Sequence, residues 1–165
     1  MFQRHKSPPF TLPEDKALIH STLISDIKGI DDGVNALTAY KGGLVNELPI
    51  GADIAAIHIA NRKGYADANL RASPFNAADS TAIVEYTANS VGVDIPASVE
   101  VLKSKYDTFV DQKIVILAGL KLLKNDYDTF SAALVSKISA DQTNGLAAVA
   151  VIDDALQSAI DLYSS

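Results

Sequence analysis

Cysteine and tryptophan are absent from this 165-residue chain, and histidine occurs only three times. Without cysteine there are no disulfides, no thiolate nucleophiles and no cysteine-based zinc sites. No run of about 18 uncharged apolar residues occurs, so the sequence predicts no membrane-spanning helix. Basic residues are also few, because 14 Lys and Arg stand against 20 Asp and Glu and leave a net charge of −6. This balance argues against a nucleic-acid partner, since such binding depends on clustered cations.

The polar residues that are present do not form a catalytic or metal-binding pattern. The three histidines have no metal-ligand spacing, and we interpret them as structural or surface residues. The adjacent acidic pairs Asp31/Asp32 and Asp153/Asp154 point in different directions on a helix, which disfavours paired acid–base chemistry. No Gly-x-Ser-x-Gly sequence typical of a hydrolase nucleophile is present. We therefore predict a protein without enzymatic activity, without a cofactor and without a metal.

Apolar residues recur at spacings of three and four along most of the chain, which is the period of an amphipathic helix. The clearest stripes lie within Leu23–Leu37 and Leu117–Leu134. We expect an all-α, single-domain bundle of five to six helices around an apolar central tunnel. Residues 1–12 are the expected lead-in and residues 13–165 the expected helical domain. The predicted helices cover about residues 13–40, 49–70, 76–92, 96–110, 113–137 and 139–163.

Helix boundaries are predicted from capping residues and prolines. A capping box over Thr11–Glu14 marks the start of the first helix, and Pro96 marks the start of the fourth. A loss of helical phase around residues 111–112 predicts a bend before the fifth helix. Ser139 with Gln142 forms a second capping box, which predicts the start of the last helix there.

Two glycines one turn apart, Gly29 and Gly33, interrupt the first predicted helix and weaken it by roughly 1 kcal/mol each relative to alanine. One interpretation is a thinned wall through which another helix or a ligand approaches the backbone. The other is close helix packing or tolerated surface positions. The sequence leaves both interpretations open.

Several segments in a fixed order resemble the fungal hydrophobic surface binding protein A family, which includes lipid-binding domains of cell-wall galactomannoproteins. The resemblance spans about residues 18–165, and its segments are Ile24–Gly43, Val115–Lys124, Asp128–Lys137 and Ile152–Tyr163. Members of that family are all-helical, secreted or wall-bound, and bind fatty acids or coat hydrophobic surfaces. The resemblance therefore implies capture of an apolar ligand and a secreted or cell-wall location.

The chain departs from wall-attached members of that family in two ways. Residues 1–9 contain no apolar segment of a signal peptide, and no Ser/Thr-rich stalk follows Ser165. These departures are expected of an excised ligand-binding domain, although a cytosolic protein is the alternative. No Asn-x-Ser/Thr sequon occurs, so N-glycosylation is not predicted.

The aliphatic stripes supply the lining expected for a fatty-acid tunnel. Burial of about a dozen methylenes contributes roughly 10 kcal/mol. Association itself costs about 4 to 15 kcal/mol, so useful affinity requires a preformed tunnel. The predicted lining residues are Ile27, Val34, Leu37, Ile57, Ile83, Tyr86, Leu102, Leu117, Leu120, Phe130, Leu134, Ile152 and Leu156.

Polar residues that interrupt these stripes are the candidate donors to a ligand carboxylate. They are Ser131, Ser90 and Asn61, and each has a structural alternative, which for Ser131 is a hydrogen bond to the Tyr127 carbonyl. The tyrosines present an apolar ring with a polar tip, and we interpret most of them as core or rim residues. One phenol at a tunnel mouth is also compatible with the sequence.

We expect the chain to bind and sequester a long-chain fatty acid, resembling palmitate or arachidonate, within the bundle. Two alternatives stay open. The first is an adaptor that adsorbs to hydrophobic material and recruits a hydrolase, and the second is a structural bundle that associates with itself. No nucleic-acid or metal partner is expected, and both a monomer and a helix-swapped homodimer are compatible with the pattern.

Overall fold

The computed structural model describes residues 13–38 and 47–165, and it describes side chains at 21–35 and 51–165. The described helices are α1 (Pro13–Thr38), α2 (Glu47–Leu70), α3 (Ala77–Asn89), α4 (Val91–Ser104), the 3-10 helix η2 (Tyr106–Gln112), α5 (Lys113–Val135) and α6 (Gln142–Ser164). These residues include no strand, which confirms the expected all-α class. No helix in this part of the chain is long and apolar enough to cross a membrane.

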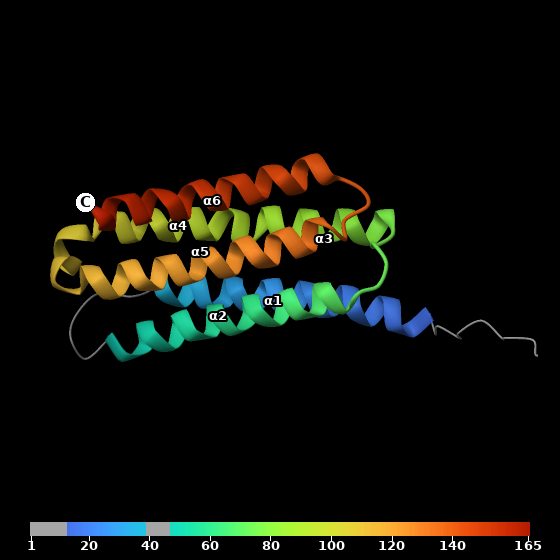
Figure 1. The fold of residues 1–165 in the computed structure, drawn as a ribbon, viewed down its shortest axis with the longest axis horizontal. Coiled ribbons are helices and arrows are strands. Elements are labelled where there is room, and N and C mark those ends of the chain that lie inside the picture. Colours follow the sequence, from blue (N-terminus) through green and yellow to red (C-terminus); the bar gives the residue numbers. More distant parts are fainter. Residues whose placement is uncertain (1–12, 39–46) are drawn as a thin grey trace, which may run out of the picture.

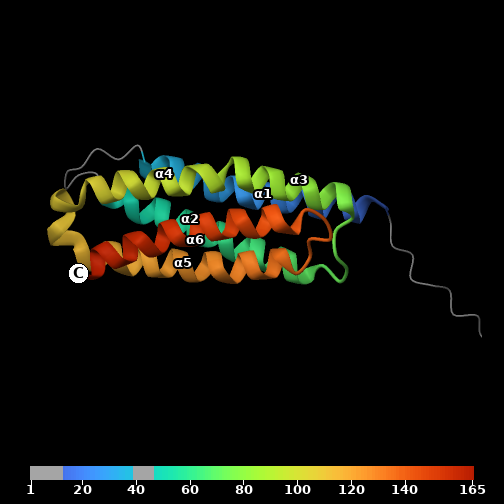
Figure 2. The same ribbon diagram turned by 90° about the horizontal axis from the view of Figure 1, so that it is seen from above.

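The helices form a closed ring around one interior. Contacts join α1 to α2, α2 to α5, α5 to α6, α6 to α4, and α4 back to α1. Seen from above, α3 and α4 lie in line and act as one broken helix (Figure 2), so the bundle has five long members. In Figure 1, α2 and α5 both start at the same end of the bundle and run parallel, whereas α6 returns antiparallel to α5.

The apolar stripes of these helices meet in the interior, as their period predicts. In α1 the buried stripe consists of Leu23, Ile27, Ile30 and Val34. Comparable stripes come from α3, α4, α5 and α6, and together they form one continuous core. α2 contributes few large side chains to this core, because Ile57 is its one buried branched residue among those described.

Close packing explains Gly33, whereas the space beside Gly29 would also admit a Cβ atom. A Cβ atom on Gly33 would lie 2.5 Å from Cγ1 of Ile57, and one on Gly29 would lie 3.4 Å from Cβ of Ala60. The first distance is shorter than any ordinary carbon contact, so α2 can approach α1 this closely only beside a glycine. Of the two interpretations offered by the sequence, close helix packing is therefore the one observed at Gly33.

The break between α3 and α4 lies at Ser90, so the boundary expected over Gly92–Pro96 is wrong. The Ser90 carbonyl accepts hydrogen bonds from the backbone N–H groups of Val93 (2.8 Å) and Asp94 (2.9 Å). These bonds build the first turn of α4 before the proline is reached. Pro96 then lies inside the helix.

The capping box expected at Ser139 and Gln142 is also wrong. The Ser139 hydroxyl donates to the Phe75 carbonyl (2.6 Å), and the Ser139 backbone N–H donates to the Ser80 hydroxyl oxygen (3.0 Å). Asp141 is the N-cap residue of α6, with φ 61° and no side-chain capping bond. The Ser139 hydroxyl is therefore engaged in a tertiary contact near the start of α3 and does not cap α6.

The remaining helix boundaries either agree with those predicted from the sequence or lie outside the described residues. The loss of phase expected at residues 111–112 corresponds to the 3-10 helix η2, and α5 begins at Lys113 as predicted. Asn76 caps α3 by accepting a hydrogen bond from the Asp79 backbone N–H at 2.8 Å. The capping box over Thr11–Glu14 and the lead-in over 1–12 fall outside the described side chains.

Candidate functional site: an apolar interior with two cavities

The first cavity has a volume of about 140 Å³ and is enclosed by α1, α2, α4, η2, α5 and α6. Most of its wall consists of isoleucine, leucine and valine side chains, with the buried ring of Phe109 from η2. Four polar residues also line it, namely Asn61, Ser98, Lys105 and Tyr127. An apolar wall with a few polar groups is typical of a site for a small organic ligand.

A second cavity of about 40 Å³ lies further along the bundle, toward α3 and the start of α6. The two cavities share three lining residues, Ile30, Ile95 and Tyr127, which form a partition between them. The Phe130 ring lines the second cavity and fills the space next to Gly64 of α2. A Cβ atom on Gly64 would lie 2.6 Å from that ring.

The predicted lining residues divide between the two cavities. Those on the wall of the first cavity are Val34, Ile57, Leu102, Leu120 and Leu156. Those on the wall of the second are Ile27, Ile83, Phe130 and Leu134. Tyr86, Leu117 and Ile152 line neither cavity. The Leu37 side chain lies outside the described residues.

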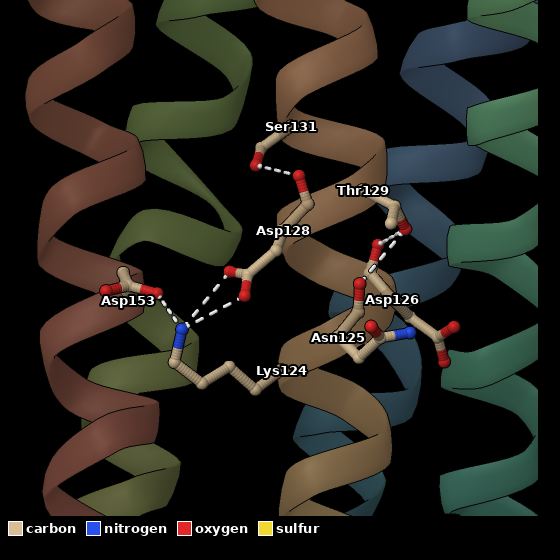
Figure 3. Close-up of polar contacts among 7 residues, drawn as sticks. All are labelled: Lys124, Asn125, Asp126, Asp128, Thr129, Ser131 and Asp153. Atoms are coloured by element: carbon tan, nitrogen blue, oxygen red, sulfur yellow. Dashed lines mark hydrogen bonds and ion pairs between the residues drawn. The ribbon is translucent and has the colours of Figure 1, made fainter.

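Two of the three predicted carboxylate donors already donate to their own helix. The Ser131 hydroxyl lies on the second cavity and donates to the Asp128 carbonyl (3.2 Å), one residue beyond the Tyr127 carbonyl expected from the sequence (Figure 3). The Ser90 hydroxyl donates to the Tyr86 carbonyl (2.7 Å), and Ser90 lines neither cavity. Such back-bonding is the structural alternative that the sequence left open.

Asn61, the third candidate, is 2% exposed and lies on the first cavity. Its Nδ2 donates to the Ile57 carbonyl at 3.0 Å, whereas its Oδ1 is buried without a hydrogen-bond partner. The orientation of the amide follows from this bond, because only the NH₂ group can donate to a carbonyl. The free atom of Asn61 is therefore an acceptor.

Tyr127 is the site residue that sequence reasoning did not single out. It is 7% exposed, and its hydroxyl is buried without a hydrogen-bond partner. Burial raises the pKa of this phenol far above its ordinary value, so the hydroxyl is a neutral donor at pH 7. The sequence feature that could have identified Tyr127 is its position in the middle of the α5 apolar stripe. There the long side chain reaches the interior, and its hydroxyl is too far from its own helix to bond to a backbone carbonyl.

Two pairs of polar side chains join α5 to its neighbours. Figure 3 shows Lys124 on α5 between Asp128 of the same helix and Asp153 of α6. On the opposite side of α5, Nδ1 of His58 on α2 lies 2.5 Å from the carboxyl group of the buried Asp126.

A third pair joins α1 to α2, where Lys63 lies 2.7 Å from Asp26. Burial of Asp26 raises its pKa to about 6, although the hydrogen bond from Lys63 lowers this pKa.

Lys105 is the one charged residue among the described residues that line either cavity. It follows the last residue of α4 and is half-buried.

The sequence matches the model of the family described as hydrophobic surface binding protein A over residues 20–136. The chain belongs to this family. The resemblance seen in the sequence is thereby confirmed. No curated protein matches the sequence.

Solved structures of similar fold come from fungal proteins of this kind. AfMP4p in complex with palmitic acid is 26% identical, with a TM-score of 0.81 over 87% of this chain and 99% of that one. Ligand-binding domain 1 of the Penicillium marneffei MP1 protein, complexed with arachidonic acids, is 21% identical, with a TM-score of 0.77 over 91% of this chain and 99% of that one. Ligand-binding domain 2 of the same protein, complexed with multiple arachidonic acids, is 15% identical, with a TM-score of 0.76 over 90% of this chain and 96% of that one.

Proposed function

We propose that this protein binds a long-chain fatty acid without catalysis and sequesters its acyl chain in the first cavity. The observation that carries the proposal is a mostly apolar cavity between the helices, partly open to solvent, with a single charged residue, Lys105, on its wall. Membership of the family and the likeness to AfMP4p in complex with palmitic acid support the same ligand class. A secreted or wall-bound protein would meet such lipids outside the cell.

The volume of the first cavity limits how the ligand is held. An engineered cavity of about 150 Å³ accepts benzene, which is far smaller than a long acyl chain. The first cavity, at about 140 Å³, therefore has to widen when the chain enters. Flexible aliphatic side chains on the wall can repack, and movement of the shared partition would add the second cavity to the first.

Lys105 is the proposed partner of the ligand carboxylate. A hydrogen bond between two charged groups is shorter and stronger than a neutral one. A lysine ammonium has three donor hydrogens, so it can bind a carboxylate in addition to another partner. Ser131 and Ser90 each have one hydroxyl donor, which already donates to a backbone carbonyl. The carboxylate would then lie at the end of the cavity formed by α4 and η2, with the acyl chain directed along the bundle.

Binding of this kind requires neither a metal nor a cofactor. Among the described side chains, no group of three His, Cys, Asp or Glu residues could hold a metal ion. The proposed role is a carrier or a sequestering protein.

A second candidate function is adsorption to hydrophobic material, which a cluster of exposed apolar residues favours. Val110, Ile114 and Val115 are 53%, 82% and 70% exposed at the junction of η2 and α5. Exposed apolar clusters of this kind mark interaction surfaces. We expect the double variant Ile114→Ser/Val115→Ser to adsorb less to polystyrene while its affinity for palmitate is retained. Loss of palmitate binding in the folded variant would contradict separate roles for surface and interior.

Extraction of the purified protein tests the leading proposal. We expect organic solvent to release a fatty acid at close to one per chain, detected by mass spectrometry against a mock purification. For protein freed of lipid, we expect added palmitate to raise the melting temperature, because a ligand that binds only the folded state stabilises it. An empty extract together with an unchanged melting temperature would overturn the proposal.

A further inference from the structure

Two buried polar atoms on the wall of the first cavity lack a hydrogen-bond partner. They are Oδ1 of Asn61 and the hydroxyl of Tyr127, whose residues are 2% and 7% exposed. Nearly all buried polar atoms in native proteins are paired, so each exception calls for an explanation. Two exceptions on one cavity wall indicate a polar group on the ligand.

The two atoms belong to residues at the same level of the bundle. α2 and α5 run parallel (Figure 1), so their residues stay in register along the axis. His58 pairs with Asp126 at 2.5 Å, and six residues further along α2, Gly64 packs against the ring of Phe130. Asn61 and Tyr127 lie between these two contacts.

The chemistry of the pair restricts the group that can satisfy both atoms. Oδ1 of Asn61 can only accept a hydrogen bond, because the Asn61 NH₂ group donates to the Ile57 carbonyl. The neutral Tyr127 phenol is available to donate. A hydroxyl group satisfies both, since it accepts one hydrogen bond and donates another. A carboxylate only accepts, so it would leave Oδ1 of Asn61 unpaired.

We propose that the first cavity selects acyl compounds that carry a neutral hydroxyl, which accepts a hydrogen bond from Tyr127 and donates one to Asn61. This inference rests on the proposed acyl-chain binding and names the ligand class more closely. The hydroxyl can come from a fatty alcohol or from a hydroxylated fatty acid.

The spacing between Lys105 and the partition fits a hydroxylated fatty acid. Ile95 lies on the partition together with Tyr127, and Lys105 follows ten residues later along the same segment. Ten helical residues span roughly 15 Å. One molecule could thus place its carboxylate at Lys105 and a hydroxyl near the far end of its chain at Tyr127.

Competition between matched ligands tests the inference. Dodecanoic acid, 12-hydroxydodecanoic acid and dodecanol would each displace a fluorescent fatty acid from the lipid-free protein. We expect 12-hydroxydodecanoic acid to bind about tenfold more tightly than dodecanoic acid, as two net hydrogen bonds allow. Dodecanol can make the same hydroxyl contacts but lacks the carboxylate proposed to bind Lys105, so we expect it to bind more weakly than 12-hydroxydodecanoic acid. In an entirely apolar cavity dodecanoic acid would bind more tightly than 12-hydroxydodecanoic acid, because burial of an unpaired hydroxyl is unfavourable.

The variant Tyr127→Phe removes the hydroxyl and keeps the ring. We expect this variant to bind 12-hydroxydodecanoic acid no more tightly than dodecanoic acid. The control Tyr86→Phe, whose residue lies on neither cavity, keeps the tenfold preference. A preference that persists in Tyr127→Phe would overturn the inference, as would a wild-type protein that binds dodecanoic acid at least as tightly as 12-hydroxydodecanoic acid. Failure of all three compounds to displace the probe would instead overturn the proposed function on which the inference rests.

Discussion

The two cavities share α1, α4, α5 and α6 but differ in capacity and in polarity, and α2 and η2 line only the first, whereas α3 lines only the second. The first has about 140 Å³, two unpartnered polar atoms and Lys105 on its wall. The second has about 40 Å³ and no charged residue among its described lining. Its one stripe serine, Ser131, already donates to a backbone carbonyl. The difference shows that the size and reach of individual side chains decide where this bundle can accept a ligand.

We attribute part of this difference to Phe130. Its ring is 3% exposed and packs directly against the backbone of Gly64, where it occupies space that a smaller side chain would leave open. In the first cavity, Ile54, Ile57 and Asn61 form the wall on α2. We therefore expect the Phe130 ring to limit the space available in the part of the interior that holds the second cavity.

The largest expected effect comes from Phe130→Ala, which would make the two cavities alike. Removal of a buried aromatic ring lowers the free energy of unfolding by about 3–5 kcal/mol. We expect urea denaturation to show this loss, and displacement assays to show a shift of preference toward longer acyl chains. The control Leu122→Ala, at a position 41% exposed, should change stability by no more than about 0.5 kcal/mol. An unchanged preference for chain length would contradict the idea that Phe130 limits the interior.

A smaller effect is expected from Lys105→Ala, which would remove the charge that distinguishes the first cavity. Hydrogen bonds to charged groups contribute about 1.5–3 kcal/mol, so we expect a loss of roughly tenfold to hundredfold in palmitate affinity, measured by calorimetry. Lys121→Ala on the exposed face of α5 is the matched control and should bind normally. Equal palmitate affinities for the two variants would show that Lys105 does not bind the ligand carboxylate.

The smallest expected effect concerns the contact that closes the second cavity. A Cβ atom on Gly64 would lie 2.6 Å from the Phe130 ring, so Gly64→Ala has to displace that ring. Overpacking of this kind costs about 1–3 kcal/mol in unfolding free energy. Gly51→Ala is the control, because nothing lies within 4 Å of its Cβ position and alanine favours the helix. A Gly64→Ala protein as stable as Gly51→Ala would show that the ring is not held there.

The periodic stripes made the helical class predictable, because burial of one face imposes a period that needs no tertiary information. Local capping signals were less reliable. Ser139 could cap a helix, yet its hydroxyl binds the Phe75 carbonyl 64 residues earlier in the chain. Sequence alone does not reveal such a competing partner.

The polar groups of the site were hard to predict for a related reason. Ser131 and Tyr127 share one stripe of α5, and the sequence favours the serine as the ligand donor. A short serine side chain reaches a carbonyl of its own helix, as Ser131 reaches Asp128. A tyrosine hydroxyl extends away from its backbone and depends on the partners that tertiary packing supplies. In this bundle packing supplies none for Tyr127.

Methyl NMR spectroscopy of the protein titrated with palmitate tests directly whether the acyl chain binds in the interior. If it does, we expect shift changes to concentrate on first-cavity methyl groups, such as those of Leu120, Leu123 and Leu156. The methyl groups of Leu146, which is 54% exposed on α6, should stay unchanged. Shift changes confined to the exposed residues Val110, Ile114 and Val115 would contradict interior binding and favour adsorption at the surface instead.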